Sequence, residues 1–257
     1  MSEELQVAID AVKQASNILL EFYNKGSAGK VENKGEVDRV SEADIRSEEV
    51  IKRMLSEKFP DYNIVGEELG DDAKKSDYTW YVDPLCGSVD FIHGYNDYGL
   101  SVALVYKNEL ILGVCGLPSL GETLWAERGK GAFLNGERIR VSKVASINDS
   151  ILTTHISVKV NDRSEIIDLV AKLSKYYLKT PGSFPYGVCN LAKGWSDGHA
   201  ELTVTAVHRL AATMIVVEAG GKWTKLDGTK PSIMDNEVLL SNGLIHDQLI
   251  EIIARKK

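Results

Sequence analysis

The spacing of apolar residues changes once along this chain, and that change constrains the fold more than any other feature. Before Pro60, apolar residues recur at spacings of three and four, which is the period of an amphipathic helix. The first such stripe ends near Gly26 and consists of Leu5, Ala8, Val12, Ala15, Leu19 and Phe22. After Pro60, short apolar runs bounded by turn residues are typical of β-strands. We therefore predict that helices come first and that a sheet follows.

Two polar segments subdivide the helical part of the chain. The stretch 29–39 is rich in Lys, Gly, Glu and Asp and has no apolar period, so we predict a mobile loop there. Ser41 and Asp44 are spaced as in a capping box, which predicts that a second helix begins at this point. Pro60 is expected to end that helix.

The rest of the chain predicts a layered α+β protein. Strands are predicted at 63–65, 79–82, 100–106, 110–115, 151–154, 202–204 and 237–241. Asn135-Gly136 between apolar flanks predicts a type I′ hairpin over 133–139. Helices are predicted near 163–175, 188–194, 208–219 and 247–256. This order indicates stacked layers of helix and sheet in one domain, 1–257, with lobes at 1–142 and 143–257.

Composition excludes several classes of protein. The 30 Lys and Arg residues against 37 Asp and Glu residues give a formal charge of −7, which argues against nucleic acid or an anionic membrane as a main partner. No apolar run approaches the ~18 residues of a membrane span, and the N-terminus does not resemble a signal peptide. Three widely spaced cysteines, Cys86, Cys115 and Cys189, favour reduced thiols. We expect a cytoplasmic protein that needs metal ions or helix N-termini to bind phosphate esters.

Two short stretches carry residues with candidate chemistry, and each also has a purely structural explanation. Gly66-Glu67-Glu68 places carboxylates at the exit of a strand, where a solvated acidic turn is the alternative. His208 and Arg209 lie in the first turn of a predicted helix, where an ordinary surface or core histidine is the alternative. Neither stretch decides a function by itself.

The segment from Asp83 to Ser88 is more informative. Asp83 lies at the carboxyl end of a predicted apolar strand, and Pro84 favours an extended conformation at Asp83. Gly87 and Ser88 then predict a tight turn in which Ser88 caps a helix. A carboxylate beside free backbone N–H groups can hold a metal ion and a phosphate together, whereas the structural alternative is an Asp-Pro turn with a serine cap.

The order and spacing of these stretches resemble the inositol monophosphatase family of metal-dependent, lithium-sensitive sugar phosphatases. That family has a Gly-Glu-Glu turn, then Asp-Pro-(Ile/Leu)-Asp-Gly-(Thr/Ser)-x-Asn-Phe, later Trp-Asp-x-Ala-(Ala/Gly)-Gly, and then Glu-Ala-Gly-Gly. The matching segments start at Gly66, Asp83, Val207 and Glu218, with further matches at 38–44 and 129–136. The resemblance runs from about Leu5 to the C-terminus, and it implies a layered α-β-α-β-α fold and a homodimer.

The resemblance also implies roles for individual residues. The ligands of the family's first metal are matched by Glu67, Asp83, the carbonyl of Leu85 and the hydroxyl of Ser88. Asp44 with Ser88, next to Glu67, matches the catalytic group that activates the attacking water, although the capping box alone also explains Asp44. The substrate contacts are matched by Gly87, Ser88, Gly182, Ser183 and Glu201. These matches imply Mg²⁺ at the first site and hydrolysis of a small phosphorylated substrate.

Two positions depart from the family pattern. Cys86 stands at the second Asp of the family's Asp-Pro motif, and His208 stands at the Asp of its Trp-Asp motif. Both positions are ligands of the family's second metal, where Asp83 is the remaining family-type ligand. Mg²⁺ binds thiolate and imidazole poorly, whereas Asp83, Cys86 and His208 form a set suited to Zn²⁺. Asp90 replaces the usual Asn, which is a milder change.

These departures leave three functional hypotheses open. One is a phosphomonoesterase, of the inositol-1-monophosphatase or fructose-1,6-bisphosphatase type, that kept its first metal and changed its second. Another is an enzyme that works slowly with the first metal alone. The third is a catalytically impaired pseudoenzyme that binds a phosphate ligand or another protein. The structural alternatives are a small residue in a tight turn for Cys86 and a helix N-cap for His208.

Overall fold

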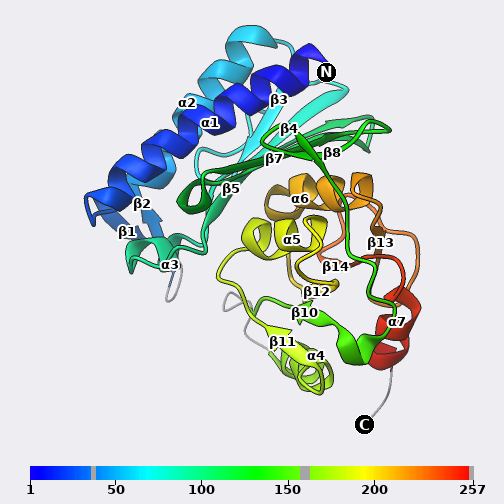
Figure 1. The fold of residues 1–257 in the computed structure, drawn as a ribbon. Helices are drawn as coiled ribbons and strands as arrows, with labels where there is room; N and C mark the ends of the chain where they lie inside the picture. Colours follow the sequence, from blue (N-terminus) through cyan, green and yellow to red (C-terminus); the bar gives the residue numbers. More distant parts are fainter. Residues whose placement is uncertain (36–38, 157–162, 255–257) are drawn as a thin grey trace.

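The protein is built of five alternating layers of helix and sheet (Figure 1). A computed structural model describes residues 1–35, 39–156 and 163–254. The helical layers are α1 (Glu3–Asn24) with α2 (Glu42–Lys58), then α5 (Phe184–Ala192) with α6 (Ala206–Glu218), and finally α4 (Ser164–Leu173) with α7 (His246–Ala254). A seven-stranded sheet lies between the first two helical layers, and a five-stranded sheet lies between the last two. The predicted layered α-β-α-β-α fold is confirmed.

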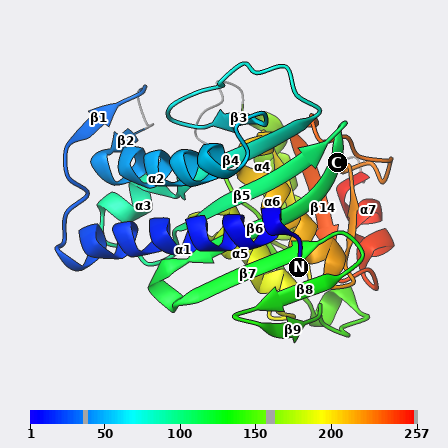
Figure 2. The same ribbon diagram turned by 90° about the horizontal axis from the view of Figure 1, so that it is seen from above.

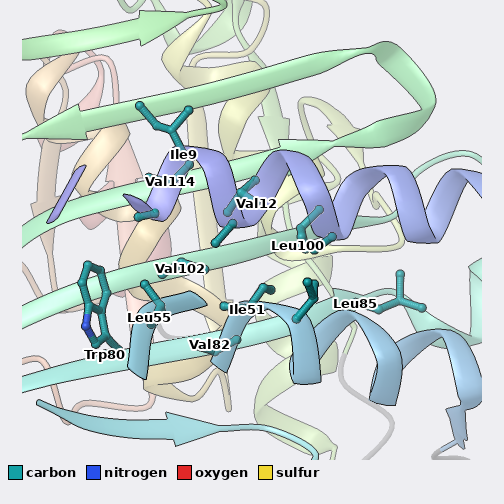
Figure 3. Packing of buried hydrophobic residues seen from close by; sticks show 14 of the residues in the cluster. Ile9, Val12, Ile51, Leu55, Trp80, Val82, Leu85, Leu100, Val102 and Val114 are labelled. Atoms are coloured by element: carbon teal, nitrogen blue, oxygen red, sulfur yellow. The ribbon is translucent and has the colours of Figure 1, made fainter. Parts of the chain in front are cut away.

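The first layer forms as the apolar spacing predicts. The residues of the α1 stripe that are buried against the sheet are Leu5, Ala8, Val12, Ala15 and Leu19. α2 begins with the predicted capping box, in which the Ser41 hydroxyl accepts from the Asp44 N–H and the Asp44 carboxylate accepts from the Ser41 N–H. Both helices lie over the strands (Figure 2), and Leu55 of α2 packs near Trp80 in the core between the layers (Figure 3).

The seven-stranded sheet supplies the strand that carries the candidate site. In sheet order, its strands are β3 (Asn63–Gly66), β4 (Tyr78–Cys86), β5 (Gly99–Tyr106), β6 (Glu109–Leu117), β7 (Glu122–Glu127), β8 (Gly131–Leu134) and β9 (Glu137–Ile139). β3 and β4 are parallel, and the other neighbours are antiparallel. In the β8–β9 turn, Asn135 and Gly136 have φ of 49° and 95°, which confirms the predicted type I′ hairpin.

The five-stranded sheet brings two distant segments to one edge. Its order is β11 (Tyr177–Lys179), β10 (Ile151–Thr153), β12 (Gly198–Leu202), β14 (Glu237–Ser241) and β13 (Lys222–Thr224). β10 runs parallel to β12, with Thr153 opposite His199. Parallel strands end at the same edge of a sheet, so the residues that follow β10 lie beside the carboxyl end of β12.

Three local predictions differ from the structure. The stretch predicted as a loop contains β1 (Val31–Asn33) and the start of β2 (Arg39–Ser41), which pair antiparallel, while 36–38 lie outside the described residues. The strand predicted at 202–204 lies earlier in the chain, as β12 (Gly198–Leu202). The apolar pattern does not reveal it, because a charged side chain and an imidazole are among its buried residues. α5 begins before the predicted position 188, because Ser183 caps it and a proline fits its first turn.

The C-terminal helix agrees with its prediction as far as position 254, and 255–257 lie outside the described residues. In the described parts of the chain, no helix has both the length and the apolar character needed to cross a membrane.

Candidate active site

The segment 83–88 turns sharply between β4 and the short helix α3 (Ser88–Ile92). Gly87 occupies the N-cap of α3 with φ of 88°, a left-handed conformation that favours glycine. Ser88 is the first helical residue, and no side chain makes a cap bond, so the prediction that Ser88 caps this helix is wrong. The Gly87 backbone takes the cap position instead, and the Ser88 hydroxyl bonds elsewhere.

The Ser88 hydroxyl joins this turn to α2. Its Oγ lies 2.8 Å from Asp44 Oδ1 and 2.9 Å from the carbonyl oxygen of Leu85. Asp44 uses its other oxygen, Oδ2, in the capping box, so the cap and the partnership with Ser88 coexist in one side chain. Burial raises the pKa of the Asp44 carboxyl above its usual value, outweighing the hydrogen bonds from Ser41 and Ser88.

Glu67 lies in a turn that the buried carboxylate of Glu48 stabilises through hydrogen bonds. Glu48 of α2 is fully buried and accepts hydrogen bonds from the N–H groups of Glu68, at 2.8 Å, and Leu69, at 2.9 Å. A Cβ at Gly66 would lie 1.8 Å from Glu48 Oε1, so glycine is required for this approach. The side chains of Glu67 and Glu68 are only 17% and 3% exposed, so the alternative of a solvated acidic turn is wrong.

His208 comes to the site from α6. It is the third residue of that helix, whose N-cap is Thr205, so the explanation of His208 as an N-cap is wrong. Its Nδ1 lies 2.8 Å from Asp83 Oδ2 and 3.6 Å from Glu67 Oε2. Asp83 is fully buried, and its Oδ1 has no hydrogen-bond partner among the described residues. A buried carboxylate oxygen without a partner is costly, so this position fits a bound cation.

Cys86 completes a cluster of three ligand-type residues. The candidate ligand atoms of Asp83, Cys86 and His208 all lie within 4.8 Å of one another. Burial, followed by the charges of Asp83 and Glu67, raises the pKa of the Cys86 thiol well above its usual value. A metal ion that binds this sulfur must therefore displace its proton.

The first predicted metal site is built from oxygen donors. The Ser88 hydroxyl donates a hydrogen bond of 2.9 Å to the Leu85 carbonyl oxygen, so these two donors lie side by side. Mg²⁺ prefers oxygen ligands of this kind. Together with Glu67 and the unpartnered oxygen of Asp83, these atoms fit a hard divalent cation, whereas the thiol and imidazole of the second site suit zinc.

Glu201 lies between two histidines in another part of the site. His199 Nε2 is 3.1 Å from Glu201 Oε2, and His155 Nδ1 is 3.4 Å from Glu201 Oε1. Burial acts to raise its pKa, but the two histidines lower the pKa of Glu201 to about 2. Strand alternation could have paired His199 with Glu201, because residues two apart share a face. No local sequence signal connects His155 with them.

One cavity of about 940 Å³ joins these groups. The predicted residues that line it are Glu67, Leu85, Cys86, Gly87, Ser88, Gly182, Glu201 and His208. Lys34, Arg39, His93 and His155 also line it, and sequence reasoning missed all four. Ser183 is instead buried, and its hydroxyl accepts from the N–H of Tyr186 to cap α5.

Comparison with known proteins identifies the family of this chain. Residues 1–257 match the model of the inositol monophosphatase family over the whole chain. The chain belongs to this family. Its members include phosphoric monoester hydrolases, and the layered fold described above is that of the solved inositol monophosphatases.

The relatives carry several activities in their names. A fructose-1,6-bisphosphatase/inositol-1-monophosphatase of Thermotoga maritima is 32% identical over 252 residues, covering 98% of this chain and 96% of the relative. A histidinol-phosphatase of Chlorobaculum parvum is 33% identical over 258 residues, covering 94% and 92%. The crystal structure of the extragenic suppressor protein SuhB from Bartonella henselae matches with a TM-score of 0.94 at 26% identity and covers 100% of both chains. Family membership therefore leaves the substrate open.

Proposed function

We propose that this protein is a metal-dependent phosphomonoesterase that hydrolyses a small sugar or inositol phosphate. The contact of 2.8 Å between Ser88 and Asp44, beside the cavity that Glu67 lines, carries the proposal. This contact brings a hydroxyl of α3 and a buried carboxylate of α2 together, although the two residues are 44 positions apart in the sequence. The names of the relatives support the substrate class. The resemblance to the family also supports a homodimer, and a monomeric mass in light scattering would contradict it.

The side chains around the cavity have distinct roles in this proposal. Glu67, Asp83 and the Leu85 carbonyl would hold Mg²⁺, and a cation bound there would supply positive charge for the phosphate and lower the pKa of a water molecule. The Ser88 hydroxyl, whose oxygen lies 2.8 Å from Asp44 Oδ1, would accept a hydrogen bond from a water molecule while it donates to that carboxylate. The backbone of the turn at Gly87 and Ser88 orients the phosphate, and the carboxylate of Glu201 accepts a hydrogen bond from a hydroxyl of the leaving group.

We propose further that the second site takes Zn²⁺ in place of Mg²⁺. The thiol of Cys86, the imidazole of His208 and the carboxylate of Asp83 are zinc-type donors whose ligand atoms lie within 4.8 Å of one another. The other oxygen of Asp83, Oδ2, lies 2.8 Å from His208 Nδ1, so this carboxylate adjoins both candidate sites. Because the thiol must lose its proton, zinc affinity should fall as the pH falls.

Metal analysis and a phosphatase assay on one preparation test both parts of the proposal. The purified protein is loaded in turn with Mg²⁺, Mn²⁺ and Zn²⁺ and assayed with p-nitrophenyl phosphate and inositol 1-phosphate. We expect metal-dependent phosphate release, and stoichiometric zinc that is lost in Cys86→Ser but kept in the control Cys189→Ala. A protein that binds no divalent metal and releases no phosphate contradicts the phosphatase proposal, and zinc unchanged in Cys86→Ser contradicts the zinc site.

The replaced carboxylates favour a second candidate function, a catalytically impaired module that binds a phosphate ligand or a protein. Cys86 and His208 remove two carboxylates that would hold a second magnesium ion. For such a module, the double variant Cys86→Asp/His208→Asp is expected to raise magnesium-dependent turnover from near zero. Robust turnover of the wild type with Mg²⁺ would eliminate this candidate.

A further inference from the structure

Three apolar side chains line the cavity beside the residues proposed to bind metal. Val89 directly follows Ser88 in α3, and Val207 directly precedes His208 in α6. Ile156, in the segment after β10, lines the cavity as well. We call Val89, Ile156 and Val207 the apolar wall. Apolar side chains next to a polar reaction centre indicate a ligand with two chemically different ends.

Electrostatic contacts show how the parts of the apolar wall are placed relative to one another. His155, the residue before Ile156, interacts with Asp90 of α3 and with His208 of α6. Each of these two partners directly follows one of the valines in the sequence. The segment 155–156 therefore lies between the two helices that carry the valines, and the apolar wall draws on three separate segments of the chain.

Two members of the apolar wall expose much of their surface. Val89 and Ile156 are each 42% exposed, and both line the same cavity. A single exposed apolar side chain on a protein surface needs no explanation, but apolar side chains gathered at a concave site mark a place where a ligand is bound. An apolar group that covers them releases the water at their surface, which favours binding.

Val207 leaves additional space at this wall. It stands at the Trp position of the family's Trp-Asp motif. Its backbone carbonyl accepts a hydrogen bond of 3.3 Å from Ser101 Oγ, which ties the start of α6 to β5. A cavity left by a smaller apolar side chain binds apolar rings in preference to water. The volume of about 940 Å³ lies near the upper end of the roughly 300–1,000 Å³ typical of sites for drug-sized ligands, which are larger than inositol phosphate.

We propose that the apolar wall binds an apolar ring on the leaving group of the phosphate ester. The inference rests on the proposed phosphatase activity and adds phosphomonoesters of ring-bearing alcohols to the sugar and inositol phosphates. The phosphate lies at the turn of Gly87 and Ser88, and the ring covers the apolar wall. Lys34 and Arg39 also line the cavity, so it has basic side chains for further phosphate or hydroxyl groups of the same substrate.

A matched pair of substrates, 2-phenylethyl phosphate and ethyl phosphate, tests the inference on the wild-type protein. Both are esters of primary alcohols of similar acidity, so the ring is the main difference between them. We expect kcat/KM for 2-phenylethyl phosphate to be higher by about ten- to hundredfold, mainly through a lower KM.

Inositol 1-phosphate, assayed on the same preparation, separates the two ways in which this test can fail. Equal constants for the matched esters, or a preference for ethyl phosphate, overturn the inference, while hydrolysis of inositol 1-phosphate shows that the phosphatase function stands. Failure to release phosphate from all three substrates contradicts the proposed function, and the inference falls with it.

Val207→Trp tests whether the apolar wall carries the preference. An indole fills the space for the ring, so the ratio of kcat/KM between the two esters should fall by about tenfold or more. The matched control is Val217→Trp, at a position of the same helix that is 38% exposed and does not line the cavity. An unchanged ratio in Val207→Trp, or an equal fall in the control, refutes the role of the wall.

Val89→Thr is a second test that does not require an indole to fit. Threonine keeps the shape of valine but replaces a methyl group with a hydroxyl, which weakens apolar contact. KM for 2-phenylethyl phosphate should therefore rise several-fold more than KM for ethyl phosphate. Equal changes for both esters in a folded variant, judged by circular dichroism, overturn the inference.

Discussion

Gly66→Ala is expected to destabilise the protein and weaken its first metal site at the same time. The three atoms nearest to a Cβ at Gly66 all belong to the Glu48 side chain, at 1.8, 2.7 and 3.3 Å, whereas ordinary contact begins at 3.4 Å. The carboxylate must withdraw by roughly 1.5 Å to reach van der Waals distance, which breaks its bonds to the N–H groups of Glu68 and Leu69. A hydrogen bond to a charged group contributes roughly 1.5–3 kcal/mol, so the expected loss is roughly 3–6 kcal/mol.

Thermal unfolding and metal activation measure the two consequences. With an unfolding entropy of about 2.1 cal/mol/K per residue, a chain of 257 residues should lose about 6–11 °C in Tm. Glu67 is the next residue and a predicted magnesium ligand, so the magnesium concentration for half-maximal activity should rise several-fold. Gly35→Ala is the matched control, because a Cβ there meets no atom within 4 Å and its φ is not left-handed. Its effect should stay within about 0.5 kcal/mol.

A double-mutant cycle with Glu48→Ala decides whether the reasoning is right. Removal of the Glu48 side chain removes all three closest contacts of the new Cβ. Gly66→Ala should therefore cost less than about 1 kcal/mol in the Glu48→Ala background, although it costs several in the wild type. Equal costs in both backgrounds would refute the proposed collision.

Three further predictions concern the rest of the fold. Arg209 is fully buried and donates hydrogen bonds to backbone carbonyls within 232–235. Arg209→Met should therefore lower the free energy of unfolding, measured by chemical denaturation, by about 3 kcal/mol or more. A loss below about 1 kcal/mol would contradict this. Burial lowers the pKa of His246 from 6.5 to about 4, so the unfolded state binds the proton more tightly than the folded state. The free energy of unfolding should therefore be highest above pH 6.5 and fall by up to about 3 kcal/mol as the pH approaches 4. An equal fall in His246→Gln would exclude this cause. Gly136 has φ of 95°, so Gly136→Ala should cost about 1–2 kcal/mol in thermal unfolding, and an unchanged Tm would argue against the strained turn.

Local chemistry made much of the fold predictable. The α1 stripe, the Ser41–Asp44 capping box and the Asn135-Gly136 hairpin depend on residues only a few positions apart, and all three are confirmed. β12 was misplaced because its burial of Glu201 depends on partners from other elements rather than on apolar side chains. The role of Ser88 as a cap was wrong for a similar reason, because its hydroxyl bonds to a carboxylate 44 positions earlier.

The sequence by itself determined the family, the layered architecture and the candidate residues on each side of the Gly87 turn, because motif spacing and apolar period are properties of neighbouring residues. Only the tertiary structure decided what those residues contact. It brought His208 against Asp83 across 125 positions and left one oxygen of Asp83 without a partner among the described residues. It also set His155 beside Glu201, because two parallel strands end at one edge of the sheet. Contacts between distant segments depend on how the layers pack, and no local pattern records them.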